Sequence, residues 1–301
     1  MLSVLIPVYN FDVRILVKTL SDQAEALQIP YEIIVIDDAS DQKVRNLNSI
    51  IREIAGVKYF EEKVNLGRSK IRNKLADIAV FDNLIYLDCD SFVDNPDFLK
   101  NYIMYFGDRN VIYGGRKYLQ NEPKNNQYLL HWLHGIKREQ IPVNKRENEP
   151  NKSFMTNNFM ITREAIDRVR FNERIRGYGH EDTLFGYDLL KCNITIKHID
   201  NPVVHIGLES SEEFLRKTRE GIKNLKRIMK INGNEKKLVK DIALLACYKK
   251  IKDFGLDGIF RYLYIKQEYR LRKNLMSQKP MLFLFDLYKL GYLCSLNGDI
   301  Q

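Results

Sequence analysis

Short apolar runs rich in β-branched residues alternate with helix-like segments along the first hundred residues. Four runs predict strands: LSVLIPV (2–8), YEIIVID (31–37), VKYFE (57–61) and NLIYLDCD (83–90). Three segments between them have helical patterns: 12–28, 42–55 and 66–80. Repeats of strand and helix with this period predict a mostly parallel sheet with right-handed crossovers, which is an α/β fold.

Polar residues follow three of these strands directly. The sequences are PVYN (7–10), DDASD (37–41) and DCDS (88–91). In open α/β sheets, ligands bind beyond the carboxyl ends of the strands. We therefore expect a nucleotide-sized crevice at this edge, with Pro7 and Tyr9 among the residues that line it.

The later part of the chain has a different pattern. The polar stretch 120–153, rich in Asn and Lys, contains the only tryptophan, Trp132, and is expected to form a loop or lid over the crevice. From about residue 208, apolar positions recur at helical spacing and predict several basic amphipathic helices. A boundary is expected near residue 207.

Composition and charge narrow the class of protein. With 301 residues, of which 45% are hydrophobic, the chain can bury a large core. Its net charge of +9 comes from residues 206–301, which hold 20 Lys and Arg against 11 Asp and Glu. Such a segment fits an anionic membrane surface, nucleic acid or acidic substrates, or is simply a solvated helical face.

Cysteine usage and hydropathy indicate the cellular compartment of the protein. The four cysteines show no CxxC pair or zinc-type spacing, and the N-terminus lacks a secretory pattern. The apolar stretch 281–296 is shorter than a bilayer span and contains Asp286 and Lys289. We expect a cytoplasmic protein without a membrane-spanning helix.

Paired carboxylates provide the first candidate chemistry. Asp88 and Asp90 flank the end of an apolar strand, where both can turn toward one hard cation such as Mg²⁺ or Mn²⁺. A turn or a helix N-cap is the alternative for this triplet. Asp37 and Asp38 follow a strand in the same way; one of them is expected to cap the next helix and the other to bind a base or ribose.

Two arginines stand one helical turn apart in NLGRSKIRN (65–73). Arg68 and Arg72 can both face a phosphate or a base edge, although the segment also reads as an ordinary helix start.

Four motifs carry a family resemblance: SVLIPVYN, EIIVIDDASD, NLGRSKIRN and LIYLDCDS. In this order and spacing, they resemble the nucleotide-sugar domain of glycosyltransferase family 2, which has the GT-A fold. The resemblance covers most of residues 1–115. It implies a UDP-sugar donor whose uracil and ribose contact Asp37 or Asp38, with Arg72 nearby. It also implies that Asp88 and Asp90 hold the metal, Mn²⁺ or Mg²⁺, together with the ribose or diphosphate.

The segment FNERIRGYGHEDTLFGYDLL resembles the Gly-Trp-Gly-x-Glu-Asp segment of metal-dependent inverting galactosyl- and N-acetylhexosaminyltransferases, including bacterial chondroitin-type polymerases. Tyr178 replaces the tryptophan. The resemblance implies that Asp182 is the general base and that Glu181 orients a sugar. The alternative is a turn whose acids cap the helix that begins near Thr183.

The same resemblance implies roles for two further residues. His205, in NPVVHIG, would complete the metal site with Asp88 and Asp90, although a lone histidine is more often a core residue. Asn158, in MTNNFMITREAI, would lie near the donor sugar. The alternative for this segment is a plain strand followed by a helix with Thr162 as its N-cap.

The sequence thus predicts an inverting, metal-dependent glycosyltransferase that transfers a hexose or N-acetylhexosamine to a glycan, including a lipid-linked one. Residues 1–207 are the expected catalytic domain, with a nucleotide-sugar half (1–115) and an acceptor half (116–207). Residues 208–301 are the expected helical region, which either docks on the anionic inner membrane face or packs as a cap. A nucleotidyltransferase and a nucleic-acid-binding protein are the rival classes; we expect no nucleic-acid partner.

Overall fold

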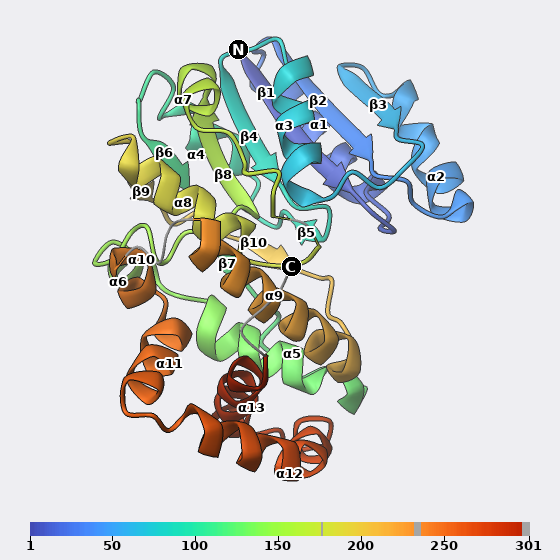
Figure 1. Cartoon of the computed structure of the whole chain (residues 1–301). Coiled ribbons are helices and arrows are strands. Elements are labelled where there is room, and N and C mark those ends of the chain that lie inside the picture. The colour runs from blue at the N-terminus through green and yellow to red at the C-terminus, as the bar shows by residue number, and fades with distance from the viewer. Residues whose placement is uncertain (176, 232–235, 297–301) are drawn as a thin grey trace. The chain divides into compact units, whose positions relative to one another are not determined.

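The computed structural model describes residues 1–175, 177–231 and 236–296 (Figure 1). The chain divides into two compact units. The first contains residues 1–119, 140–176 and 181–207, and the second contains residues 120–139, 177–180 and 208–301.

A seven-stranded sheet forms the centre of the first unit, with the strand order β3-β2-β1-β4-β8-β6-β9. Its strands are β1 (Leu2–Val8), β2 (Tyr31–Asp37), β3 (Val57–Glu61), β4 (Asn83–Leu87), β6 (Val111–Tyr113), β8 (Asn158–Thr162) and β9 (Ile196–His198). Strand β8 runs antiparallel to both of its neighbours, and the other pairings are parallel. The predicted α/β class with a mostly parallel mixed sheet is confirmed.

Helices cover both faces of this sheet because successive side chains of a strand point to opposite faces. Leu2, Val4 and Ile6 of β1 pack with α1 and α4, whereas Leu5 packs in the cluster that contains α3, α7 and α8. The helices and the short helical turn of this unit are α1 (Arg14–Ala26), α2 (Gln42–Asn48), η1 (Ser49–Glu53), α3 (Arg68–Ile78), α4 (Phe98–Ile103), α6 (Val143–Arg146), α7 (Arg163–Arg168) and α8 (Glu181–Lys191).

A second, three-stranded sheet lies in the same unit, with the order β5-β10-β7. Its strands are β5 (Ser91–Phe92), β7 (Arg116–Lys117) and β10 (Val203–His205). Because β5 begins one residue after Asp90 and β10 ends with His205, this small sheet brings two residues of the predicted metal site close together.

The second unit is helical. Its elements are η2 (Asn126–Tyr128), α5 (Leu129–His134), η3 (Gly135–Glu139), α9 (Ser211–Ile231), α10 (Lys236–Asp241), α11 (Ala243–Asp253), α12 (Asp257–Leu275) and α13 (Leu282–Ser295). Buried side chains of α5, α9, α12 and α13 form one core, which includes Leu130, Phe214, Tyr264 and Phe285. Among the described residues no helix has both the length and the apolar character needed to cross a bilayer.

Residues 120–153 are not the plain loop that was one expectation for them, whereas the lid role remains a prediction. The segment forms η2, α5, η3 and α6, and its part 120–139 groups with the helical unit. The reason is that Leu130 is fully buried beside Phe214 and Phe285, so a few apolar residues anchor a segment whose composition is otherwise polar. The first unit ends at Gly207, next to the boundary that the sequence indicated.

Candidate active site

The polar residues that follow β1, β2 and β4 lie at one edge of the main sheet. The parallel register pairs Pro7 with Ile36 and Val8 with Asp37, so the carboxyl ends of β1 and β2 coincide. Tyr9 directly follows β1, and its side chain is 55% exposed. An accessible aromatic ring at this position is suited to contact a planar base; the role of Pro7 and Tyr9 in donor binding remains a prediction.

Asp37 and Asp38 are both buried and shape the loops around this edge. Asp37 Oδ1 accepts a hydrogen bond from the Ser40 amide at 2.7 Å. Asp38 accepts from the amides of Leu66 and Gly67 at 2.6 and 3.0 Å, directly before α3. The expectation that one of the two caps α2 was wrong, because Asp41 occupies the position before that helix.

Burial raises the pKa of Asp38, although the two backbone donors act against this increase. The loop before α3 is thereby tied to the end of β2, and this fixes where Arg68 and Arg72 begin their helix. A role of Asp37 and Asp38 in donor binding remains a prediction.

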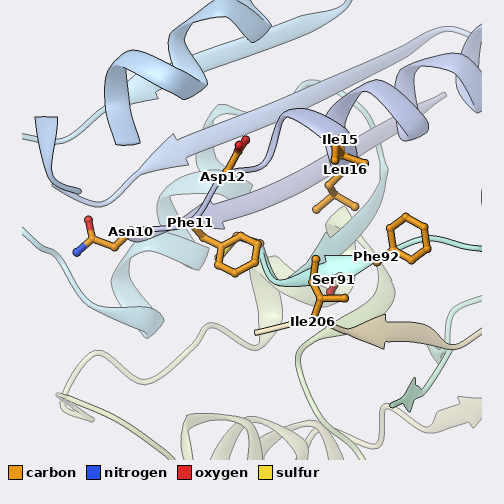
Figure 2. Close-up of a pocket in the computed structure, with 9 residues that line it drawn as sticks. Asn10, Phe11, Asp12, Ile15, Leu16, Ser91, Phe92 and Ile206 are labelled. Atoms are coloured by element: carbon orange, nitrogen blue, oxygen red, sulfur yellow. The ribbon is translucent and has the colours of Figure 1, made fainter. Parts of the chain in front are cut away.

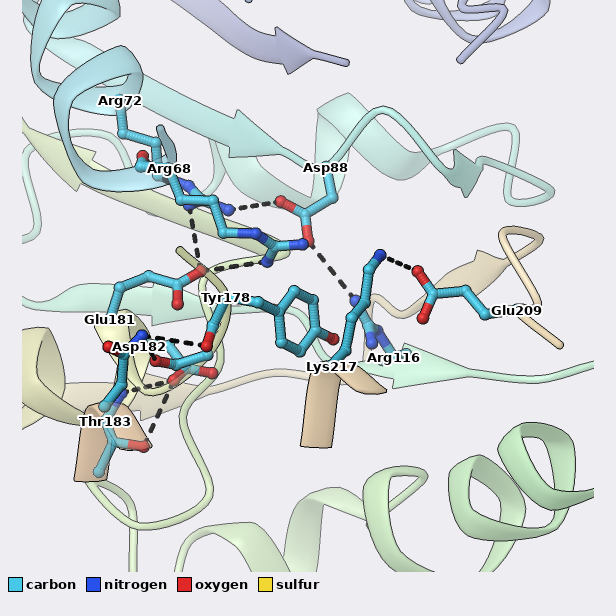
Figure 3. Close-up of polar contacts among 12 residues, drawn as sticks. Arg68, Arg72, Asp88, Arg116, Tyr178, Glu181, Asp182, Thr183, Glu209 and Lys217 are labelled. Carbon is cyan, nitrogen blue, oxygen red and sulfur yellow. Dashed lines mark hydrogen bonds and ion pairs between the residues drawn. The ribbon is translucent and has the colours of Figure 1, made fainter. Parts of the chain in front are cut away.

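A buried ion-pair network connects α3, the Asp-x-Asp turn and α8 (Figure 3). Arg72 donates to Asp88 Oδ1 at 2.7 Å and lies 3.6 Å from Glu181 Oε1. Arg68 donates to the same oxygen of Glu181 at 3.1 Å. The side chains of Arg72 and Glu181 are only 3% and 5% exposed, so their charges are weakly screened.

Arg116 is a residue that the sequence analysis missed. It lies on β7, and its guanidinium approaches the other oxygen of Asp88 at 3.5 Å. No motif marks it, because the contact depends on the pairing of β7 in the small sheet. Three arginines therefore gather around Asp88 and Glu181 beside the Asp-x-Asp turn.

Asp90 and His205 form a second polar pair in the first unit. Asp90 Oδ1 lies 3.4 Å from His205 Nδ1, and the Ile206 amide donates to the main-chain oxygen of Asp90 at 2.9 Å. Gly207 leaves room for this carboxylate, since a Cβ atom at Gly207 would lie 2.6 Å from Asp90 Oδ2. Burial alone would raise the pKa of Asp90, but His205 and nearby arginines outweigh it and hold the pKa below its ordinary value.

The residues present fit the predicted metal site in part. A carboxylate and an imidazole from Asp90 and His205 are suitable ligands for a divalent ion. Asp88, by contrast, is occupied by Arg72 and Arg116. Within the ranges that the structure describes, no three acidic, His or Cys side chains stand close enough to hold a metal ion together. The three-ligand site remains a prediction.

Two adjacent carboxylates at the start of α8 have opposite properties. Burial acts to raise the pKa of Glu181, but Arg68 and Arg72 overcome this effect and lower it. Burial and the negative charge of Glu181 raise the pKa of Asp182 to about 6, against the hydrogen bond from the Thr183 amide. Carboxylates whose pKa values are driven apart are typical of acid–base sites.

The segment that precedes this pair belongs to the helical unit and is held by α9. Asn224, which is 1% exposed, donates through its amide nitrogen to the main-chain oxygens of Tyr178 and Gly179 at 3.0 and 3.2 Å. Gly179 has φ +92°, and a Cβ atom there would lie 3.1 Å from Gly221 Cα. Lys217 Nζ lies 4.9 Å from the centre of the Tyr178 ring.

Asn158 is the first residue of β8 and pairs with Leu87, the residue before Asp88. Its side chain is fully buried, and its amide nitrogen donates to the main-chain oxygens of Gly115 and Asn201 at 3.0 and 2.9 Å. Its Oδ1 accepts from Tyr102 at 2.7 Å. The side chain is thus held within the fold, and the expected place of Asn158 near the donor sugar remains a prediction. The alternative for this segment was a strand followed by a helix with Thr162 as its N-cap. The N-cap is confirmed, because the Thr162 side chain accepts a hydrogen bond from the Ala165 amide at 3.3 Å.

A small, mainly apolar pocket of about 340 Å³ lies beside the carboxyl end of β1 (Figure 2). Its wall is formed by side chains from the start of α1, from the Asp-x-Asp turn and from the end of β10, including Phe11, Leu16, Phe92 and Ile206. The pocket also touches Ser91, so it borders residues adjacent to Asp90 and His205.

Comparison of the fold with solved structures defines the class of protein to which the chain belongs. The solved structures of similar fold include the mannosyltransferase PcManGT of Pyrobaculum calidifontis in complex with GDP-Man and Mn²⁺ (TM-score 0.52, 13% identity, 95% of this chain and 85% of that one). Residues 1–349 of S. aureus TarS in complex with UDP give a TM-score of 0.50 (18% identity, 74% of this chain and 64% of that one). The fold is that of the GT-A glycosyltransferases.

The family follows from the sequence. Residues 3–170 match the model of glycosyl transferase family 2, and the chain belongs to this family. It is 26% identical over 233 residues to a hyaluronan synthase of Pasteurella multocida and 28% identical over 215 residues to an uncharacterized glycosyltransferase of Haemophilus influenzae. These matches cover 66% and 69% of this chain, but the chain spans only 24% of the synthase, against 80% of the second relative. The resemblance to family 2 is confirmed.

Proposed function

We propose that the protein is an inverting, metal-dependent transferase that moves a hexose or N-acetylhexosamine from a UDP-sugar to a hydroxyl of a growing glycan. The observation that carries the proposal is the carboxylate pair at the start of α8. Glu181 is held by two arginines, whereas Asp182 is only partly buried and has a pKa raised to about 6.

Asp182 has the properties of a general base. An alcohol is a weak nucleophile, so a carboxylate within hydrogen-bond reach must accept its proton as the new bond to the anomeric carbon forms. The bond from that carbon to the diphosphate breaks with its electron pair staying on the phosphate oxygen. A single in-line displacement of this kind inverts the anomeric carbon, and Asp182 afterwards releases its proton to water.

The arginines around the Asp-x-Asp turn are suited to the charge of the departing group. Guanidinium groups form charge-assisted, often bidentate hydrogen bonds with phosphate oxygens. Arg72 is buried and held between Asp88 and Glu181, so its orientation is fixed before a ligand arrives. We assign Arg68, Arg72 and Arg116 to the donor diphosphate.

Asp90 and His205, with Asp88, are the residues that would hold a divalent cation. When bound, Mn²⁺ or Mg²⁺ supplies Lewis-acid stabilisation of the negative charge that develops on the diphosphate. The close approach of Gly207 to Asp90 keeps this carboxylate beside His205.

Ligands of proteins with this fold guide the choice of probes. The S. aureus TarS structure contains UDP, and the PcManGT structure contains GDP-Man with Mn²⁺. Two of the relatives are named as synthases of hyaluronan and chondroitin. UDP and a panel of UDP-sugars are therefore the first ligands to test, with GDP as the comparison.

Calorimetric titration of UDP, with Mn²⁺ and then with a chelator, tests the donor site. We expect metal-dependent binding that Asp90→Asn weakens and that Asp182→Asn leaves unchanged. Binding of GDP in preference to UDP would refute the donor class, and equal UDP affinity with and without chelator would refute metal dependence. The anomeric configuration of the transferred or released sugar, measured by proton NMR, tests inversion.

A further inference from the structure

The outer surface of the helical unit exposes an unusual number of large apolar side chains. Eleven of them lie within residues 254–287, including Phe254, Tyr269 and Phe283, which are 78%, 76% and 66% exposed. Single exposed apolar residues are normal in soluble proteins, but a gathering on adjacent helices marks an interaction surface.

Helix α12 (Asp257–Leu275) shows how this surface is built. Its buried side contains Tyr264 and Leu275, which pack in the core with α9 and α13. Its exposed residues recur three or four apart and therefore share the opposite face of the helix. They alternate in kind along that face: Ile259, Tyr262, Lys266, Tyr269 and Lys273.

The charge of this surface is strongly positive. Residues 249–279 contain nine Lys and Arg but only three acidic residues. Of these three, Glu268 is paired with Arg219 of α9, and Asp257 is half-buried. Lys266 Nζ lies 4.5 Å from the centre of the Tyr262 ring, so basic and aromatic groups are in direct contact on this face.

We propose that the outward face of α12, together with the exposed Met281 and Phe283 at the start of α13, docks the enzyme on an anionic phospholipid surface. Aromatic and aliphatic side chains enter the headgroup region, while Lys and Arg stems extend so that their charged ends reach the phosphates. We call this surface the docking face. The inference deepens the proposed function by naming where a lipid-linked acceptor is met.

Other partners fit this face less well. Lysine is depleted in the buried centre of protein interfaces, yet Lys266 and Lys273 stand in the middle of the face. Nucleic acid would use the basic and aromatic residues, but aliphatic side chains such as Ile259 and Ile265 would gain nothing from it. A membrane interface uses all three kinds of side chain.

Sedimentation of the full chain with vesicles tests the docking face. We expect binding to vesicles of phosphatidylcholine mixed with phosphatidylglycerol, weakened by salt, and little binding to phosphatidylcholine alone. Each basic side chain near an anionic surface contributes about fivefold to partitioning, so Lys266→Glu/Arg270→Glu/Lys273→Glu should weaken binding by at least about 100-fold, because the loss of three attractions alone gives that factor and the new carboxylates add repulsion. Tyr262→Ser/Tyr269→Ser/Phe283→Ser should also weaken it, although no charge changes.

A control variant with the same change in net charge separates the effect of the docking face from the effect of net charge. Lys43→Glu/Lys124→Glu/Lys223→Glu alters three exposed lysines outside residues 249–283 and should retain most of the binding. Equal losses in the two charge variants would overturn the proposal, as would wild-type binding in the aromatic variant.

Two results would assign the face to another partner and also overturn the proposal. One is a dimer, seen by light scattering, that the aromatic variant loses. The other is salt-sensitive RNA binding without vesicle binding. UDP titration of the same variants keeps the two proposals separate, because a failed docking face leaves UDP affinity intact and a failed donor site leaves vesicle binding intact.

Discussion

Replacing Asp182 by asparagine should stabilise the protein at neutral and alkaline pH. Burial and the charge of Glu181 raise the pKa of Asp182 from 3.8 to about 6. Each pKa unit corresponds to about 1.4 kcal/mol, so the folded protein disfavours the ionised carboxylate by about 3 kcal/mol. Asparagine has nearly the same shape and no charge, and removes this cost.

The sign of the pH dependence follows from linkage. Because the pKa is higher in the folded than in the unfolded state, the cost is absent where Asp182 is protonated in both states, below about pH 4. It grows as the pH rises from there and is complete above about pH 6. The stabilisation by Asp182→Asn should therefore be large at pH 8 and absent at pH 4.

Thermal unfolding followed by circular dichroism measures the effect. For a chain of this size 1 kcal/mol changes the melting temperature by roughly 2 °C, which gives an increase of about 6 °C at pH 8. A melting temperature that falls at pH 8, or changes equally at both pH values, would refute the raised pKa. Asp253→Asn, which changes an exposed carboxylate at the end of α11, serves as the control.

Three further predictions concern the residues around the pair. Arg72→Met removes the cation shared by the buried Glu181 and the partly buried Asp88, and should cost at most about 3–5 kcal/mol in urea unfolding, because Arg68 and Arg116 remain; Arg72→Lys should cost less, and equal losses would contradict the ion-pair account. Gly207→Ala forces the side chain of Asp90 to move and should weaken Mn²⁺-dependent UDP binding at least about tenfold, with an unchanged circular dichroism spectrum. Asn224→Ala releases the main-chain oxygens of Tyr178 and Gly179, and should lower kcat while the Kd for UDP stays constant; a parallel loss of UDP affinity would show a general structural defect.

The first hundred residues were predictable because their signals are local. Apolar runs with polar ends predicted β1, β2 and β3 at the observed residues, and β4 from its observed start, although β4 ends at Leu87 and not at Asp90. Since parallel strands end at a common edge, the same pattern also indicated that Tyr9, Asp37 and Asp88 would gather there. The carboxylates of α8 were recognised from a short motif, but the opposite directions of their pKa shifts depend on burial and on Arg68 and Arg72, which lie more than a hundred residues earlier.

The remaining features depend on contacts between distant residues. Arg116 and Asn224 carry no motif, and their partners became visible only in the fold. Asn158 was singled out through the family resemblance, whereas its hydrogen bonds, which join three buried segments, became visible only in the fold. In 120–139 a polar composition concealed Leu130, whose burial decides the structure of that segment.

The pH dependence of UDP release from a UDP-sugar, with Mn²⁺ and with water or glycan as acceptor, tests the central claim most directly. For the wild-type chain we expect the rate to increase with pH and to level off above about pH 6, as Asp182 loses its proton. Asp182→Asn should be slower by about 10²- to 10⁴-fold and show no such increase, while binding UDP normally. Wild-type turnover in Asp182→Asn, with the same pH profile, would contradict the assignment of this carboxylate as the base.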